Sequence, residues 1–204
     1  MTKFQNIDYY NIESLLTEEE LLVRNTIREF VDDNILPIIE KHNRAGTFPL
    51  GLVPKMAGLG LFGSTLPAKY GCAEMNNVAY GLVMQELERG DSGVRSFASV
   101  QSALVMYPIY TFGSEQQKEY WLPKLASGEK IGCFGLTEPD YGSNPGGMIT
   151  RAEEKGDCYL LNGAKMWITN GTIADIAVVW AKLGGVIHGF LVEKGTKEIG
   201  RAHV

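Results

Sequence analysis

The sequence lacks the features that would point to nucleic acid or a membrane as a partner. Lysine and arginine together number 19 against 24 aspartate and glutamate residues, and basic residues never cluster beyond a pair. Nucleic acids are bound by basic surfaces, so we expect no nucleic-acid partner. No apolar run approaches the roughly 18 residues that a membrane-spanning helix needs, so no membrane partner is expected either.

Cysteine and histidine are too few and too scattered to suggest disulfides or a metal site. The chain has three of each, without a Cys-x-x-Cys pair or the histidine spacing of zinc ligands, so we expect no metal. Residues 1–11 also lack the apolar core of a secretion signal. We therefore expect reduced thiols in a bacterial cytoplasm, or in the mitochondrial matrix if the source is eukaryotic.

Helical patterns dominate the first 131 residues. Thr17 and Glu20 form the pattern of a capping box, and apolar residues then recur at helical spacing toward Pro37. Ser114 and Gln117 repeat the capping pattern at the start of a helix over 114–126. Between these two helices the sequence predicts others at about 50–56, 74–88 and 92–110.

Beyond Gly132 the pattern changes to short apolar runs, which predict antiparallel strands at 159–161, 165–169, 176–181 and 187–192. Asn162-Gly163 and Gly184-Gly185 are typical hairpin turns. The expected fold class is α+β. An all-helical N-terminal domain (1–131) precedes an incomplete antiparallel β-domain (132–198), and residues 199–204 form a tail.

Two segments carry the most informative motifs of the sequence. Residues 134–143 run Phe-Gly-Leu-Thr-Glu-Pro-Asp-Tyr-Gly-Ser, an apolar stretch that enters a turn-rich loop whose backbone N–H groups are not all used by regular structure. Residues 165–170 run Lys-Met-Trp-Ile-Thr-Asn. Together they look like a flavin-binding site, because a flavin needs hydrogen-bond donors at its pyrimidine edge and a neighbour for N5. Taken alone, each segment is more often a turn or part of a core.

Together the two segments resemble the acyl-CoA dehydrogenase family, and the resemblance covers nearly all of residues 15–195. It implies an FAD-dependent α,β-desaturation of an acyl-CoA substrate, electron transfer to an electron-transferring flavoprotein, a homotetramer and a helical C-terminal domain. The catalytic glutamate lies on that domain, beyond this chain, so no catalytic base is assigned. The implied cofactor-binding residues are Phe134, Gly135, Leu136, Thr137, Glu138, Gly142, Ser143, Trp167, Ile168 and Thr169.

The segment from Glu88 to Ser102 resembles one branch of the family, the glutaryl-CoA dehydrogenases. Arg95, Ser99, Ser102 and Met106 follow at steps of four, three and four, which places them on one helical stripe. An arginine fork beside hydroxyl groups suits the distal carboxylate of a dicarboxylyl thioester. The predicted substrate-binding residues are Arg95, Ser96, Ser99 and Ser143, with Glu88 holding Arg95.

The resulting hypothesis is oxidative decarboxylation of glutaryl-CoA to crotonyl-CoA, a step of lysine degradation. One alternative is a dehydrogenase of monocarboxylic fatty acyl-CoA in which Arg95 is structural. Another is an inactive fragment that only binds partners. The last six residues, Ile199 to Val204, depart from the family pattern, and we interpret them as a non-native tail on a truncated reading frame. A genuine short exposed tail is the alternative. We expect the chain alone to be inactive and not to retain FAD.

Overall fold

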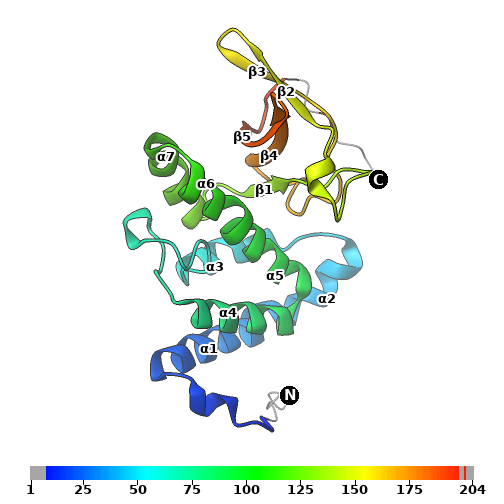
Figure 1. Cartoon of the computed structure of the whole chain (residues 1–204). Coiled ribbons are helices and arrows are strands. Elements are labelled where there is room, and N and C mark those ends of the chain that lie inside the picture. Colours follow the sequence, from blue (N-terminus) through cyan, green and yellow to red (C-terminus); the bar gives the residue numbers. More distant parts are fainter. Residues whose placement is uncertain (1–7, 198–199, 201–204) are drawn as a thin grey trace. The chain divides into compact units, whose positions relative to one another are not determined.

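The chain divides into two compact units in the computed structural model, which describes residues 8–197 and 200 (Figure 1). The first unit comprises residues 1–99 and 126–128, and the second comprises 100–125 and 129–204. The sequence predicted a domain boundary after residue 131, and that boundary stays a prediction. The expected tail falls, apart from Gly200, outside the described residues.

The first unit is entirely helical in its described residues. Thr17 caps the first long helix as predicted, since its Oγ1 accepts a hydrogen bond from the Glu20 amide at 3.2 Å while Glu20 Oε2 accepts one from the Thr17 amide at 2.8 Å. The elements are η1 Ile12–Leu15, α1 Glu18–Phe30, the π-helix η2 Val31–Ile35, α2 Leu36–Ala45, η3 Leu50–Leu52, α3 Val53–Gly58, η4 Ala68–Tyr70, α4 Asn77–Gly90 and α5 Ser92–Ser99.

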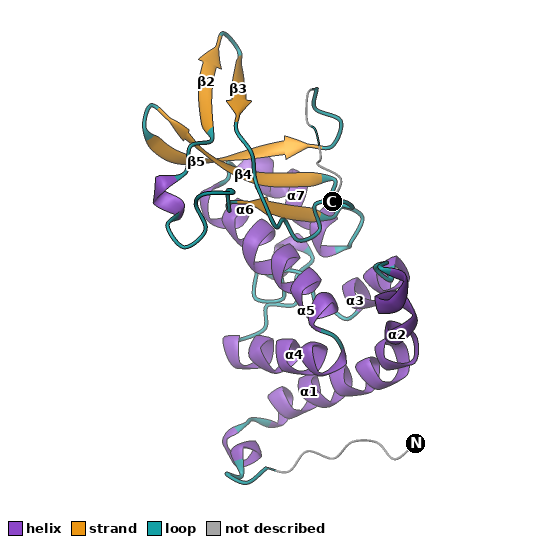
Figure 2. Cartoon of the chain, turned by 90° about the vertical axis from the view of Figure 1, so that its right-hand side faces the viewer, coloured by secondary structure: helices purple, strands orange, loops and turns teal. Residues whose placement is uncertain are grey.

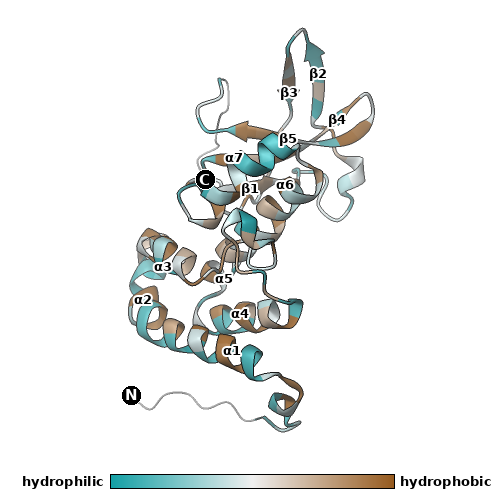
Figure 3. Ribbon diagram, turned by 90° about the vertical axis from the view of Figure 1, so that its left-hand side faces the viewer, coloured by the Kyte–Doolittle hydropathy of each residue, from teal (hydrophilic) through white to brown (hydrophobic). Residues whose placement is uncertain are grey.

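Helix α1 packs along α4 (Figure 2), and hydrophobic and hydrophilic residues alternate around α1 (Figure 3). A partly buried ion network joins them. The Glu86 side chain is 1% exposed and binds Arg28 Nη2 at 2.6 Å and Arg89 Nε at 2.8 Å, while Arg89 Nη2 binds Asp32 at 2.8 Å. Since every charge in the network has a partner, it fixes α4 without leaving an unpaired buried ion.

The second unit combines helices with a five-stranded sheet. Strand β4 is central: it pairs parallel with β1 and β2 along one edge and antiparallel with β5 along the other, while β3 pairs antiparallel with β2. The elements are the π-helix η5 Val100–Met106, α6 Tyr107–Phe112, α7 Glu115–Ala126, β1 Gly132–Gly135, η6 Pro145–Gly147, β2 Arg151–Lys155, β3 Cys158–Asn162, β4 Ile176–Leu183 and β5 Val186–Glu193.

The expected fold class, helical domain then sheet domain, is confirmed, but the sheet is mixed rather than antiparallel. The Gly184-Gly185 hairpin forms as predicted between β4 and β5. Asn162-Gly163 is not a hairpin turn, because among the described residues no strand follows it until β4, and β3 pairs instead with β2 through a turn at Gly156. Glycine is required at position 163 because the chain passes close to Thr150: a Cβ there would lie 2.3 Å from Thr150 Oγ1.

The expected helix over 92–110 is interrupted by η5, and this changes which residues share a face. A π-helix takes one more residue per hydrogen-bonded turn than an α-helix, so α-helical spacing fails there. Ser102 and Met106 are buried, at 6% and 0% exposure, whereas Leu104, which the stripe does not include, is 39% exposed. The predicted stripe is therefore wrong beyond Ser99.

Gln101 fastens η5 to the chain around β1. Its side chain is fully buried, and its Nε2 donates to the carbonyl oxygens of Leu125 at 3.0 Å and Lys130 at 2.9 Å. Its Oε1 accepts from the Gly132 amide at 2.8 Å. Gly132 allows the close approach, because a Cβ there would lie 2.4 Å from Val105 Cγ1. Among residues 8–197, no helix is long and apolar enough to span a membrane.

Candidate functional site

A cavity of about 230 Å³ lies in the second unit where β1 ends. The segment after β1 and the segment before β4 form its walls, and η5 completes them. Six of the ten residues predicted to bind a cofactor line it, together with two residues that the sequence did not point to. The lining residues are Phe134, Leu136, Thr137, Trp167, Ile168, Thr169, Val100 and Leu104.

Trp167 is the most unusual residue of this cavity. The residue is 83% exposed, and its backbone has φ 59°, in the left-handed region that non-glycine residues rarely adopt. The Met166 amide donates to the Thr137 carbonyl at 2.9 Å, and Asn170 Nδ2 donates to the Gly132 carbonyl at 3.1 Å. The expected strand at 165–169 is therefore not formed, and the segment turns at Trp167. The hydrogen bonds of Met166 and Asn170 hold the segment on either side of the exposed indole. Strained residues of this kind cluster at binding sites.

The lining suits a planar aromatic group with a polar edge. Aromatic and aliphatic side chains supply flat apolar contacts, and Thr137 and Thr169 supply hydroxyl groups. Neither hydroxyl has a hydrogen-bond partner among the described residues, so both remain available to a ligand. The isoalloxazine ring of a flavin has this combination of flat faces and a hydrogen-bonding edge, so the residues present fit the predicted cofactor.

Glu138 does not line the cavity, although the sequence predicted that it binds the cofactor. Its side chain is 1% exposed, and it accepts hydrogen bonds from the amides of Ile149 at 2.7 Å and Thr150 at 3.0 Å. Lys165 Nζ lies 2.9 Å from Glu138 Oε1. Burial alone would raise the pKa of Glu138, but the hydrogen bonds from Thr150, Ile149 and Lys165 outweigh it and lower that pKa to about 2. Glu138 is thus an ionised anchor of the loop.

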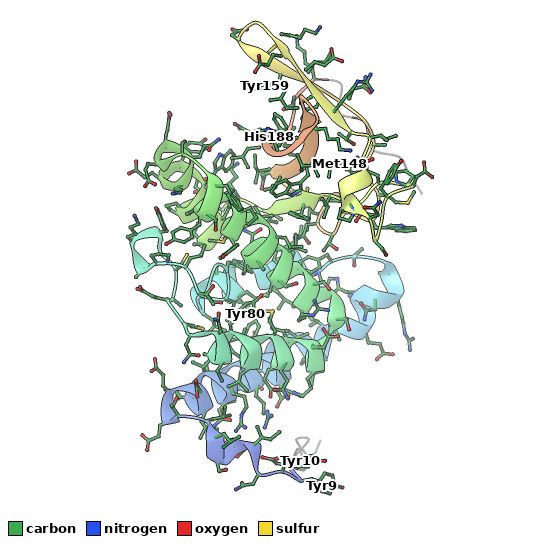
Figure 4. The ribbon with its side chains drawn as sticks, in the orientation of Figure 1. Tyr9, Tyr10, Tyr80, Met148, Tyr159 and His188 are labelled. Carbon is green, nitrogen blue, oxygen red and sulfur yellow. The ribbon has the colours of Figure 1, made fainter. Side chains whose placement is uncertain are left out.

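Three glycine and serine positions of the first segment also lie outside the cavity lining. Gly135 is buried in β1, where a Cβ would lie 3.5 Å from the Lys165 side chain. Gly142 and Ser143 are exposed in the loop that follows. That loop is closed by reciprocal backbone hydrogen bonds between Glu138 and Tyr141 and leads to the buried Met148 (Figure 4). Ser143 is accessible to a ligand but not placed in the cavity.

The predicted substrate-binding residues of the first unit come together between α4 and α5. Arg95 Nε pairs with Glu88 at 2.5 Å, and Arg95 Nη1 lies 3.4 Å from Ser99 Oγ. The Ser99 hydroxyl also donates to the Ser96 carbonyl at 3.1 Å. Tyr80, on α4 (Figure 4), interacts electrostatically with Arg95. Burial raises the pKa of Tyr80, and the positive charge of the guanidinium opposes that rise.

A second cavity, of about 290 Å³, escaped sequence reasoning. It lies in the second unit between the α6–α7 region and the strands β4 and β5, with Phe112, Trp180 and His188 among its lining residues. Trp180 Nε1 is buried without a hydrogen-bond partner in the described residues. Its lining residues come from β4, β5 and the α6–α7 region, which are far apart in sequence. No local sequence pattern could therefore have predicted this cavity.

Known proteins share both parts of the chain. The model of the acyl-CoA dehydrogenase N-terminal domain matches residues 17–129, and the model of the acyl-CoA dehydrogenase middle domain matches residues 133–203. The human mitochondrial short-chain specific acyl-CoA dehydrogenase is 39% identical over 173 residues, which are 85% of this chain and 42% of the human protein.

Solved structures agree with these matches. A glutaryl-CoA dehydrogenase from Mycobacterium smegmatis in complex with FADH2 has 51% identity and a TM-score of 0.90, over 92% of this chain and 48% of that protein. A structure described as an electron transferring flavoprotein of Acidaminococcus fermentans contains a chain with 36% identity and a TM-score of 0.84, over 94% of this chain and 50% of that chain. This chain thus spans about half the length of the proteins it matches. It belongs to the acyl-CoA dehydrogenase family of FAD-dependent oxidoreductases.

Proposed function

We propose that this chain forms the N-terminal and middle-domain part of an FAD-dependent acyl-CoA dehydrogenase, and that the cavity beside Trp167 holds the flavin ring. The observation that carries the proposal is the exposed, strained Trp167 next to two hydroxyl groups that have no hydrogen-bond partner among the described residues. FAD, when bound, supplies the two-electron oxidation of the substrate. Trp167 would pack against the ring, and Thr137 would donate a hydrogen bond where negative charge develops.

We also propose glutaryl-CoA as the substrate, with Arg95 as the group that binds its distal carboxylate. Glu88 binds Nε of the guanidinium, and Nη2 has no partner among the described residues, so that side of the fork can bind a carboxylate. Ser99 lies on the same side, near Nη1. The Arg95 side chain is 34% exposed, which leaves it accessible to a ligand. The reaction would be oxidative decarboxylation to crotonyl-CoA.

Other parts of the proposal rest on the family alone. Ser143, exposed in its loop, would contact the CoA portion of the substrate. The electrons would pass to an electron-transferring flavoprotein, and the complete protein would be a homotetramer in a bacterial cytoplasm or a mitochondrial matrix. We propose cofactor binding for Gly142, Ile168 and Thr169 as well.

A second candidate function is a dehydrogenase of short monocarboxylic acyl-CoA. The 39% identity to a short-chain specific relative favours it. In that case the pairing of Arg95 with Glu88 would only join α4 to α5. The two functions differ in one measurable way, because a carboxylate that enters a binding site without a cation there binds poorly.

The first prediction therefore concerns Arg95→Met. We expect kcat/KM for glutaryl-CoA to fall at least about a hundredfold, roughly 2.7 kcal/mol, and kcat/KM for butyryl-CoA to change little. The measurement uses a chimera in which residues 1–197 precede the remainder of the M. smegmatis glutaryl-CoA dehydrogenase. Arg44→Met is the matched control, since Arg44 pairs with Glu40 on an exposed helix surface. An equal loss for both substrates would make Arg95 structural and favour the second candidate.

A further inference from the structure

Lys165 joins the two segments that form the walls of the Trp167 cavity. Its Nζ donates to the Leu136 carbonyl at 3.0 Å and to Glu138 Oε1 at 2.9 Å. Its side chain is only 11% exposed, so these two contacts take the place of water. One of its partners lines the cavity, and the other anchors the loop behind it.

The next residue adds a second link of the same kind. The Met166 amide donates to the Thr137 carbonyl at 2.9 Å. Three successive residues after β1, 136 to 138, are thus bound by two successive residues, 165 and 166. Glu138 extends the connection to a third segment through the amides of Ile149 and Thr150.

The Lys165–Glu138 pair is not the simplest way to stabilise this region. Removing two charges from water costs several kcal/mol per ion, and a well-packed apolar pair is often as stable. Ions with fixed hydrogen-bond partners, however, accept fewer alternative arrangements than apolar side chains do. Trp167 needs such support, because its left-handed backbone persists only where the surroundings hold it.

We propose that Lys165 is a positioning residue that sets the spacing of the Leu136–Thr137 and Trp167–Thr169 walls, so that the cavity is formed before a flavin enters. That the cavity holds a flavin rests on the proposed function. The positioning by Lys165 depends only on contacts within this chain. Lys165 acts through the Leu136 carbonyl and Glu138, not by touching the ligand. A merely structural Lys165 would change stability everywhere in the second unit equally.

The experiment compares amide hydrogen exchange in the 204-residue chain and its variants by NMR. In Lys165→Met we expect the Met166 amide to exchange at least tenfold faster, while amides of the β4–β5 ladder exchange at the wild-type rate. Lys182→Met is the matched control: Lys182 lies half-buried in β4, and its side chain has no partner among the described residues. It should leave the Met166 amide unchanged.

Because Lys165→Met leaves the Glu138 carboxylate buried without its cation, a double variant guards against a general loss of folding. Lys165→Met combined with Glu138→Gln should be more stable than Lys165→Met alone. The Met166 amide should still exchange at least tenfold faster than in wild type, because the Leu136 carbonyl has lost the hydrogen bond from Lys165. An unchanged Met166 amide, or equal acceleration of every amide in the double variant, would overturn the positioning role.

An FAD titration of the same proteins separates this inference from the proposed function. If wild type binds and the double variant binds at least fivefold more weakly, both stand. If wild type binds and the double variant binds equally well, the inference is wrong and the cofactor site remains. If wild type shows no binding up to the solubility limit of FAD, a range that includes the weak binding expected of a chain that does not retain FAD, the proposed flavin cavity is wrong, and the hydrogen-exchange result alone decides whether Lys165 positions the two segments.

Discussion

At the scale of single residues, the two segments singled out in the sequence come together in the structure, but not all of their side chains face the same cavity. Phe134, Thr137 and Trp167 line the cavity, and their binding of the cofactor stays a prediction. Glu138 lies in the same motif but points to backbone amides and Lys165. A motif fixes which residues occur together, whereas the face to which each points depends on contacts with chain far away in sequence.

Glu138 gives the second prediction, which concerns acid stability. Its pKa is lowered from 4.5 to about 2. A lowered pKa contributes stability that is complete above the unfolded pKa and is lost as pH falls through the folded one. We expect Glu138→Gln to reduce the free energy of unfolding by about 2 to 3 kcal/mol at pH 7, and this difference to shrink as the pH falls from 4.5 toward 2.

Urea unfolding across this pH range checks the Glu138 prediction. Glu154→Gln serves as control, since Glu154 is exposed on β2 and its side chain has no hydrogen bond or ion pair among the described residues. A difference between wild type and Glu138→Gln that stays constant from pH 7 to pH 2 would contradict the ionised, hydrogen-bonded carboxylate.

Thr137 gives the third prediction, on the flavin itself. Thr137→Val removes a hydroxyl at nearly constant volume, so a bond to the charged form of the cofactor worth about 1.5 to 3 kcal/mol should be lost. In the FAD-loaded chimera this makes the two-electron reduction potential about 30 to 60 mV more negative. Spectroelectrochemistry measures it, with Thr111→Val on α6 as control. A reduction potential of Thr137→Val equal to that of Thr111→Val would show that Thr137 does not bind the flavin.

At the scale of elements, the two reciprocal capping patterns were predicted correctly and the long-range strand pairing was not. Thr17 with Glu20, and Ser114 with Gln117, form the predicted reciprocal caps, because all partners lie within four residues. The parallel contacts of β1 and β2 with β4 were missed, since they join residues far apart in sequence. The π-helix η5 was missed as well, and it places Val100 and Leu104 in the cavity.

Gln101 gives the fourth prediction, which tests how η5 is held. Gln101→Met keeps the approximate volume but leaves the Gly132 amide and two carbonyl groups without a partner. We expect a loss of about 2 to 4 kcal/mol in the free energy of unfolding. Gln116→Met, at an exposed position of α7, should change it by less than about 0.5 kcal/mol. Equal effects of the two substitutions in urea unfolding would refute the anchoring role.

At the scale of the whole chain, the sequence predicted the family and the order of a helical and a sheet region. Both rest on motifs and periodicities that are local. The division into compact units between Ser99 and Val100 could not be predicted, because it depends on which side of one helical stretch makes more contacts in space. The chain covers about half the length of the relatives that it matches.

The central claim is that the cavity beside Trp167 accepts a flavin, and an FAD titration followed at the indole N–H resonances tests it most directly. The chain has three tryptophans: Trp167 in this cavity, Trp180 in the second cavity and Trp121, which is 6% exposed. Weak, saturable binding should shift Trp167 and leave Trp121 and Trp180 in place. A Trp167 resonance that does not move up to the solubility limit of FAD, or a shift of Trp180 in its place, would contradict the account.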